Sequence, residues 1–325
     1  MPVYNAVPFL EAAITSVLSQ QGTDFELIAV NDASTDGSGA VLDRFAGKAN
    51  FRRLDLDQNL GQSAALNHGL AVARGTWVKF FDADDLMSPG HLAAQVASLR
   101  GTTRHLSACA WAGFRGDPAK AVRREAATDR DYNDPVAWIL DSLELDEGMM
   151  PGWRWLIPRE VLDKAGGWDE RLSLNNDFEF SIRLLLHSEG VRFAPAASLL
   201  YRQAVAGSLS KRLSSTAMAS AWLTTRLGCE YLLSRDSGPR ARRLCADRMQ
   251  DWHFRFYPKF PHLASAAETE IKALGGSGLA FPGGQLGRQL SRILPWKAVR
   301  QLQAAAGACG WDRVQKMKAA LRAKG

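Results

Sequence analysis

The sequence predicts an α/β protein in which helices flank a mostly parallel central sheet, followed by a mainly helical C-terminal extension. The sheet is predicted because, between residues 25 and 100, short runs of strand formers alternate with segments whose apolar residues recur at helical spacing. The extension is predicted from charge: residues 1–210 hold 20 basic and 27 acidic residues, and residues 211–325 hold the remaining 20 and 7 of the chain's 40 and 34. We therefore expect an acidic body (1–210) and a basic extension (211–325).

The elements of the body follow one another with short turns between them. Leu10, Ile14 and Val17 form one apolar stripe and predict the first helix. Asn59–Gln62 predicts a turn into a later helix, which Arg74-Gly75 ends. The predicted strands are 25–30, 52–56 and 78–81, and the predicted helices are 8–20 and those through 41–45 and 66–70.

Three carboxylates follow the strand at 78–81 directly: Asp82, Asp84 and Asp85. Ligands of open α/β sheets bind at such strand ends. Because close carboxylates repel each other, we expect either a retained proton or a divalent cation whose shell phosphate oxygens complete. The alternative is an acidic turn before the next helix, with Ser88 as N-cap and Pro89 in its first turn.

Asp32 also comes directly after a predicted strand, in a loop rich in turn-forming residues. If its strand neighbours the one at 78–81, the carboxylates of both converge on one crevice. No G-x-G-x-x-G follows any predicted strand, and there is no Walker-type lysine loop. Dinucleotide-binding and P-loop functions are therefore disfavoured.

Several short segments within residues 1–205 together resemble the inverting glycosyltransferases of family 2, which have the GT-A fold. Each segment alone is weak, and their order and spacing make the resemblance specific. The segments are Pro2-Val3-Tyr4-Asn5, Val30-Asn31-Asp32-Ala33-Ser34-Thr35-Asp36, Asn59-Leu60-Gly61 through Asn67-His68-Gly69, and Phe81-Asp82-Ala83-Asp84-Asp85.

The resemblance implies a role for four of these residues. Tyr4 would lie against the nucleotide base and Asp32 would hydrogen-bond it, while Asp82 would contact the ribose. Asp84 would bind Mn²⁺ or Mg²⁺ on the donor diphosphate. The structural alternatives are that Tyr4 is a packed aromatic residue and Asp32 a turn former.

A second resemblance lies in the string G-G-W-D-E at 166–170 with N-D-F-E-F-S-I-R-L at 176–184. In the family a Glu-Asp pair at this point supplies the catalytic base. Here Asn176 replaces the glutamate and Asp177 keeps the aspartate position, so the resemblance implies that Asp177 is the base. A plain helix N-cap is the alternative. At a helix start, the dipole is expected to keep the Asp177 pKa low.

The middle of the chain predicts a strand at 105–114, an irregular loop at 115–135 that could cover a pocket, and helices at 138–143 and 158–167. Trp153 and Trp155 flank Arg154. Trp153 and Arg154 could form a stacking face for an acceptor sugar, or the tryptophans could be ordinary core residues.

Two further features depart from the family pattern. Relatives begin with an apolar strand before P-x-Y-N, so we expect either a misassigned start or an abbreviated first strand. Relatives also carry a metal-binding histidine where this chain has Ala204. The metal would then be held by Asp84, phosphates and water, or by another loop residue.

The extension matches no family. We expect a helix at 217–233, a loop at 275–287 and basic helices at 289–302 and 313–322, with an aromatic and basic cluster at 252–257. One interpretation is a solvated helical addition. The other is a peripheral anchor on an anionic membrane face. Nucleic-acid binding is not expected, because no recognised module supports it.

No apolar run is long enough to span a membrane, no signal-peptide pattern is present, and the four cysteines are scattered. These features predict a cytoplasmic protein, peripheral on the inner face of the membrane. The function expected is metal-dependent, inverting transfer of a sugar from a UDP-sugar to a glycan or lipid-linked hydroxyl, in surface polysaccharide or glycolipid synthesis. Alternatives are a non-catalytic nucleotide-binding or scaffold descendant, and a nucleotidyltransferase, for which 2–8 lacks the glycine-rich loop.

Overall fold

The structure is a computed structural model that describes residues 1–203 and 214–308. The chain divides into two compact units, one from Met1 to Leu244 and a second that begins at Cys245. Each unit has its own apolar core. The first unit carries all the residues to which the resemblance assigns a role.

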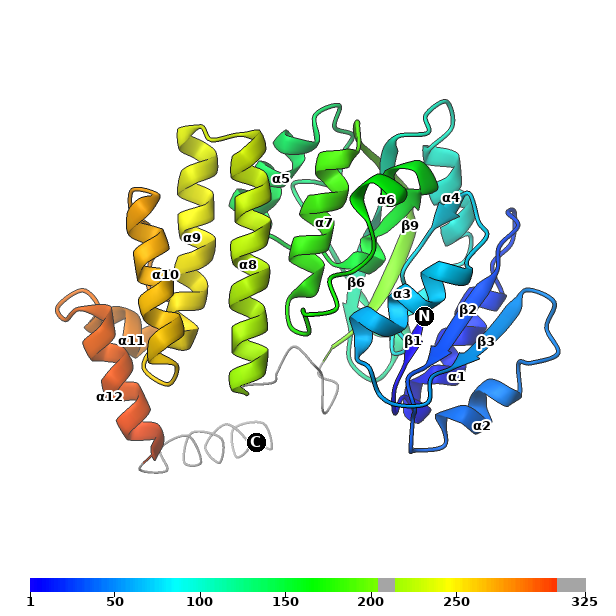
Figure 1. Cartoon of the computed structure of the whole chain (residues 1–325), viewed down its shortest axis with the longest axis horizontal. Helices are drawn as coiled ribbons and strands as arrows, with labels where there is room; N and C mark the ends of the chain where they lie inside the picture. Colours follow the sequence, from blue (N-terminus) through cyan, green and yellow to red (C-terminus); the bar gives the residue numbers. More distant parts are fainter. Residues whose placement is uncertain (204–213, 309–325) are drawn as a thin grey trace. The chain divides into compact units, whose positions relative to one another are not determined.

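A three-stranded parallel sheet opens the first unit, in the order β1-β2-β3 (Figure 1). Every residue of β2 is buried, as expected for a strand covered on both faces. The alternating pattern that predicted a parallel sheet is confirmed here. The elements are β1 Pro2–Val3, α1 Val7–Leu18, β2 Leu27–Asn31, α2 Ser38–Asp43, β3 Phe51–Asp55 and α3 Gln62–Val72.

A second sheet has the order β4-β8-β6-β9-β5, and β7 pairs with β6 at its edge. It is mixed: β6 and β9 are parallel, and the other pairs are antiparallel. An apolar run does not reveal which strand will be its neighbour, so the antiparallel pairing in this sheet could not be read from the sequence. The strands are β4 Trp77–Val78, β5 Leu86–Met87, β6 His105–Phe114, β7 Val122–Arg124, β8 Trp155–Pro158 and β9 Gly190–Arg202.

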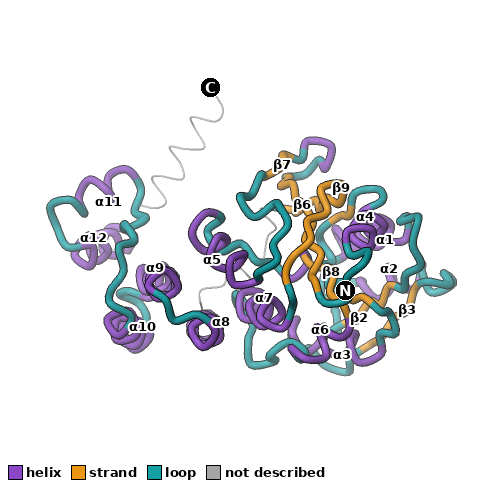
Figure 2. The backbone as a smooth tube through the Cα atoms, turned by 90° about the horizontal axis from the view of Figure 1, so that it is seen from above, coloured by secondary structure: helices purple, strands orange, loops and turns teal. Residues whose placement is uncertain are grey.

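Helices cover both faces of the strands in the first unit. Figure 2 shows α1 and α4 on one side of the strands and α3, α6 and α7 on the other. Helix α7 is buried nearly all round, which explains its run of large apolar residues. The remaining helices are α4 His91–Ser98, α5 Pro135–Leu145, α6 Arg159–Ala165 and α7 Asn176–His187, with 3-10 turns η1 Pro118–Lys120 and η2 Gly152–Arg154.

Two local expectations are wrong. Ser88 does not cap a helix, because its backbone N–H and its hydroxyl bond Ser198 of β9, and α4 begins only after Gly90, whose φ is 71°. The strand at 78–81 is also shorter than expected, and β4 pairs with β8 rather than with β2. The end of β2 and the segment after β4 therefore belong to different sheets.

Helix α8 (Ser215–Arg235) packs on α7 within the first unit. Gly228 allows the approach, since a Cβ there would lie 2.6 Å from the Phe178 ring. The Ser220 hydroxyl accepts N–H bonds from Ser173 at 2.7 Å and Leu174 at 3.1 Å. The charge boundary near residue 210 thus lies inside the first unit, and a functional division at that residue stays a prediction.

The second unit is helical. Phe254 of α9 packs with Phe281 and Val299, and Trp296 contacts this cluster. The predicted helix at 289–302 is wrong, because α11 ends before Pro295 and a new helix begins after it. The predicted helix at 313–322 lies outside the described residues. No described helix is both long and apolar enough to cross a membrane. The bounds are α9 Pro239–Phe256, α10 Pro261–Ala273, α11 Gln285–Leu290 and α12 Trp296–Ala308.

Candidate active site

Asp82 lies half-buried in the segment after β4. Burial, followed by the charges of Asp84 and Asp177, raises the pKa of Asp82 to about 7. Gln62, the first residue of α3, donates its side-chain N–H to Asp82 Oδ1 at 3.0 Å. The repulsion expected from the D-x-D-D spacing is therefore present, and it reaches Asp177 as well.

Arg202, the last residue of β9, bonds the backbone of Asp84 and the carboxylate of Asp85. Its Nε donates to the Asp84 carbonyl at 2.8 Å, and its backbone N–H donates to Asp85 Oδ1 at 2.7 Å. Asp85 is fully buried, and its Oδ2 has no hydrogen-bond partner in the described structure. Burial is the main cause that raises the pKa of Asp84 and of Asp85. The pKa of Asp85 rises well above the usual range of an aspartate.

Asp177 lies in the first turn of α7 and accepts the Gly152 N–H at 2.8 Å. It is not the cap: Asn175, with φ 63°, occupies the N-cap position. Burial raises the pKa of Asp177 to about 6, against the lowering effect of the Gly152 bond. The expectation that the helix dipole keeps this pKa low is therefore wrong, because desolvation outweighs it.

The backbone around Asp177 is tightly fitted. A Cβ on Gly152 would lie 3.0 Å from Asp177 Oδ1 and 2.7 Å from the Trp168 ring, so only glycine fits here without movement. Asn176, in the place of the family's glutamate, is buried and donates to the Ser63 hydroxyl at 3.1 Å. Since Ser63 belongs to α3, this bond ties the start of α7 to the helix whose Gln62 holds Asp82.

Tyr201 is a site residue that the sequence did not reveal. Its ring stacks on Trp153 with centroids 6.0 Å apart and meets the Trp111 ring edge-on. Burial, followed by the charges of Asp85, Asp82, Asp84 and Asp177, raises the pKa of Tyr201 to about 12. The carboxylates after β4 and the carboxylate of Asp177 are thus close enough for their charges to act on the Tyr201 phenol. Its position next to Arg202 at the end of β9 was the available signal.

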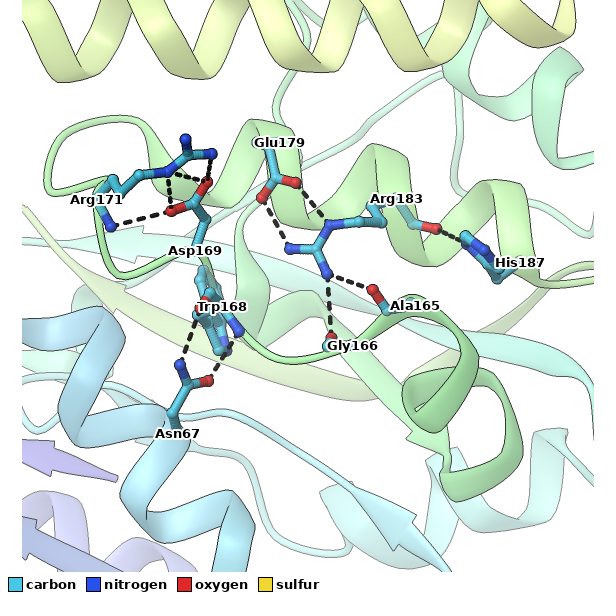
Figure 3. Close-up of polar contacts among 9 residues, drawn as sticks. All are labelled: Asn67, Ala165, Gly166, Trp168, Asp169, Arg171, Glu179, Arg183 and His187. Atoms are coloured by element: carbon cyan, nitrogen blue, oxygen red, sulfur yellow. Dashed lines mark hydrogen bonds and ion pairs between the residues drawn. The ribbon is translucent and has the colours of Figure 1, made fainter.

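The G-G-W-D-E segment is fastened to α3 (Figure 3). Asn67 accepts the Trp168 N–H at 2.8 Å and donates to the Trp168 carbonyl at 2.9 Å. A Cβ on Gly167 would lie 2.5 Å from Asn67 Oδ1, which explains the glycine. The Trp168 ring stacks on Phe180 of α7 at 3.9 Å. The segment around Asn67 in α3 and the G-G-W-D-E segment, far apart in sequence, therefore together support α7, which carries Asp177.

Asp32 and Tyr4 lie at the ends of β2 and β1. Asp32 is 2% exposed, and its carboxylate accepts N–H bonds from Asn59 at 3.0 Å, Leu60 at 2.7 Å and Gly61 at 2.9 Å. It therefore shapes the turn into α3, with at most about one lone-pair position left. Tyr4 is 47% exposed. Its ring is thus not a packed core aromatic.

Trp153 and Arg154 are both buried. Arg154 has no exposed side-chain surface, and its guanidinium pairs with Asp129 at 2.7 Å and lies over the Trp138 ring. The expectation that Arg154 faces an acceptor is wrong for this reason. Trp153 supports Tyr201 instead, and its carbonyl accepts the Lys79 ammonium at 2.7 Å.

Within residues 1–203 and 214–308, no group of three or more His, Cys, Asp and Glu side chains is arranged to hold a metal. Asp82, Asp84 and Asp85 nevertheless offer crowded hard oxygen donors, and the Asp85 Oδ2 is unpaired. One or two carboxylates with substrate phosphates are a common Mg²⁺ environment. The site thus fits a cation that arrives with its substrate. Ala204 lies outside the described residues.

Curated relatives share parts of the sequence. A glycosyltransferase of Bacillus subtilis, the uncharacterized EpsJ, is 27% identical over 205 residues, which cover 62% of this chain and 60% of EpsJ. The succinoglycan biosynthesis protein ExoO of Rhizobium meliloti is 35% identical over 89 residues, covering 27% of this chain and 25% of ExoO. The matches therefore span less than two thirds of these relatives' own length.

Solved structures share the fold. The crystal structure of Staphylococcus aureus TarS 1–349 has a TM-score of 0.64 at 15% identity, covering 94% of this chain and 90% of TarS 1–349. Its complex with UDP-GlcNAc has a TM-score of 0.61 at 16% identity, covering 84% and 88%. The sequence model of the family "Glycosyl transferase family 2" matches residues 1–166, half of the chain. With its α/β fold and its carboxylate-lined site, this chain belongs to glycosyl transferase family 2.

Proposed function

We propose that the protein is a metal-dependent inverting glycosyltransferase that moves a sugar from a UDP-sugar to a hydroxyl of a glycan or lipid-linked acceptor. The observation that carries this proposal is that helix α3 holds both ends of the carboxylate site, since its Gln62 bonds Asp82 and its Ser63 bonds Asn176, the neighbour of Asp177. UDP-GlcNAc is the ligand of the TarS structure with the same fold, and succinoglycan biosynthesis is the stated process of ExoO. Both support a role in surface polysaccharide or glycolipid synthesis.

Asp177 is proposed as the base. A carboxylate with a pKa of about 6 is mostly ionised at neutral pH, and it is more basic than an exposed aspartate. As the acceptor oxygen forms its bond to the anomeric carbon, its proton passes to Asp177. The bond from that carbon to the donor phosphate breaks, and the nucleoside diphosphate leaves with the electron pair. A single displacement of this kind inverts the anomeric centre.

Asp84 is proposed to hold Mn²⁺ or Mg²⁺. Such an ion would offset the charge of the leaving diphosphate as a Lewis acid. The chain's own contribution is to fix this segment, through the bonds of Arg202 to the Asp84 backbone and the Asp85 carboxylate and of Gln62 to Asp82. The charges of Asp84 and Asp177 add to burial in raising the pKa of Asp82, and a cation between the carboxylates would reduce this repulsion.

The nucleotide is proposed to lie at the ends of β1 and β2. The exposed Tyr4 ring can stack on a base, and the remaining acceptor position of Asp32 can receive one base N–H. Asp82 would contact the ribose. Asn5 ties this edge to the loop after β2, because it accepts the Thr35 N–H at 2.8 Å.

We also propose that the protein works on the cytoplasmic face of a membrane and touches anionic lipid. The support lies in the second unit, where Ile293 is 84% exposed and Leu294 is exposed beside Arg292. An apolar tip with a basic neighbour is typical of interfacial segments.

Calorimetric titration with a panel of nucleotide sugars, with and without Mn²⁺, tests the function. We expect UDP-sugar binding that requires Mn²⁺ and is lost in Asp84→Ala. The control is Asp163→Ala, which removes an exposed carboxylate of α6. Binding that is indifferent to the metal would contradict the place given to the ion. Binding without turnover on any acceptor would favour a non-catalytic descendant of the fold.

A further inference from the structure

A cavity of about 440 Å³ opens at the edge of the second sheet, where β7 pairs with β6. Trp111 and Phe114 of β6 give it an aromatic wall. No Asp or Glu of the described chain lines it. Its charged lining side chains are all cationic: Arg115, Lys120, Arg123 and Arg124.

These four cations have no ion-paired carboxylate in the described chain, although Arg123 is close enough to Asp129 for its charge to act on that group. None of them forms an ion pair with an acidic side chain of residues 1–203 or 214–308, whereas neighbouring Arg130 and Arg154 pair with Asp141 and Asp129. The Arg124 guanidinium instead lies 5.7 Å from the centroid of the Trp111 ring. Because like charges gathered without an ion-paired counter-charge repel, the group favours an anion from outside the chain.

The cavity is connected to the carboxylate site by the sheet itself. Trp111 lines the cavity and also meets Tyr201, with ring centroids 6.0 Å apart. Where β6 pairs with β9, Gly113 lies opposite Tyr201. Both Gly113 and Gln203 line the cavity. One aromatic residue thus borders the basic cavity on one side and, on the other, Tyr201, whose neighbour Arg202 bonds Asp84 and Asp85.

The two places have opposite charge, which assigns them to different substrates. The carboxylate site repels an anion unless a cation comes with it, so it suits a metal-bound donor diphosphate. The basic cavity needs no metal to attract an anion. Arginine forks match phosphate oxygens in particular.

We propose that this cavity binds a phosphate or diphosphate group of the acceptor, which makes the acceptor a phosphate-bearing glycan or lipid. The inference rests on the proposed function, since it names the acceptor class of the same site. The anion is held beyond Trp111, and the attacking hydroxyl of the same molecule reaches the space between Tyr201 and Asp177.

Titration of the full chain with inorganic pyrophosphate in the presence of EDTA tests the cavity alone, because removal of divalent metal silences the donor site. We expect the double variant Arg123→Glu/Arg124→Glu to weaken pyrophosphate binding at least about tenfold. Arg100→Glu, an exposed arginine outside the cavity, is the matched control and should bind as the unchanged protein does. Circular dichroism verifies that each variant is folded, and Arg123→Gln/Arg124→Gln gives a milder pair.

If Arg123→Glu/Arg124→Glu binds pyrophosphate as tightly as Arg100→Glu and the unchanged protein do, the inference is overturned. UDP-sugar binding with Mn²⁺ is measured on the same proteins, and it should not depend on Arg123 or Arg124. If donor binding fails while the cavity variants still lose pyrophosphate, the proposed function falls and an anion site remains. If donor binding holds and pyrophosphate is indifferent to the variants, only the cavity assignment falls.

Farnesyl diphosphate and a glycerol phosphate oligomer distinguish the two sources of phosphate. Tighter binding of farnesyl diphosphate than of pyrophosphate, lost in the double variant, identifies a lipid-linked diphosphate. Tighter binding of the oligomer, lost in the same way, identifies a phosphate within a glycan. Either result supports a phosphate-bearing acceptor. If the double variant binds both ligands as tightly as the unchanged protein does, the result contradicts it.

Discussion

Two opposing effects act on Asp177, and their magnitudes decide its chemistry. A helix N-terminus stabilises a carboxylate by about 0.3–1 kcal/mol. The rise of the pKa from 3.8 to about 6 corresponds to roughly 3 kcal/mol in the other direction. Burial therefore prevails, and it gives the base a useful proton affinity that an exposed N-cap aspartate would lack.

The pH dependence of catalysis follows from this pKa. Asp177 must be ionised to accept a proton, so kcat/KM should fall about tenfold per pH unit below pH 6 and level off above it. Initial rates from pH 5 to pH 8 at saturating metal measure this. A profile that stays flat through pH 6 would contradict the role of Asp177.

Asp177→Asn should separate catalysis from stability. The folded pKa is raised, so the protonated carboxyl favours the fold below pH 4, and this favourable contribution is lost as the pH rises through 6. At pH 7 the neutral amide should raise the free energy of unfolding by about 1–3 kcal/mol. Turnover should fall at least about a hundredfold. Chemical denaturation and rate assays measure both, with Asp163→Asn as the control that changes neither.

At the scale of elements, α7 depends on one buried ion pair (Figure 3). Arg183 donates to Glu179 through Nε at 2.6 Å and through its terminal nitrogen at 2.9 Å. It also bonds the Ala165 carbonyl at 2.5 Å and the Gly166 carbonyl at 3.1 Å, at the end of α6. The Arg183 guanidinium therefore joins α7 to the end of α6 and to the first residue of the G-G-W-D-E segment.

Arg183→Ala should destabilise the first unit by about 3–5 kcal/mol, because Glu179 is left buried without its partner. The matched control is Arg171→Ala, which breaks the more exposed pair with Asp169 and should cost less than about 1 kcal/mol. Urea denaturation of both variants compares the two. An equal loss of unfolding free energy in both variants would contradict the role given to the buried Arg183–Glu179 pair.

At the scale of the whole molecule, charge is divided along the chain. The basic excess after residue 210 is +13, and the earlier part carries −7. In the second unit the apolar residues of the 252–257 cluster are buried, so that cluster is core rather than a binding face. The most exposed apolar residue of the second unit, Ile293, lies between α11 and α12 instead, with the exposed Leu294 next to it.

Ile293→Asp/Leu294→Asp should therefore weaken binding to vesicles of phosphatidylcholine with phosphatidylglycerol by about tenfold. Leu145→Asp, at an exposed leucine of α5, is the matched control and should not change it. Co-sedimentation at low and physiological salt measures both. Unchanged binding of the double variant would contradict membrane contact at this tip.

The sequence by itself determined the parallel βα repeat, the strand at 105–114, the helix that begins near Asp177 and the family. Each of these is a local pattern: periodicity, a turn residue or a motif at a fixed spacing. Local patterns also predicted that Asp82 and Asp84 follow one strand, because neighbours in sequence must be neighbours in space.

Only the tertiary structure decided which distant groups meet. Tyr201 joins the carboxylates because β9 runs parallel to β6 and ends beside Asp84. Arg154 turned out to be core, and Asp177 acquired a raised pKa, because burial depends on the elements packed above a residue. The direction of a strand and the dielectric around a carboxylate are properties of the assembled sheet, and no stretch of sequence contains them.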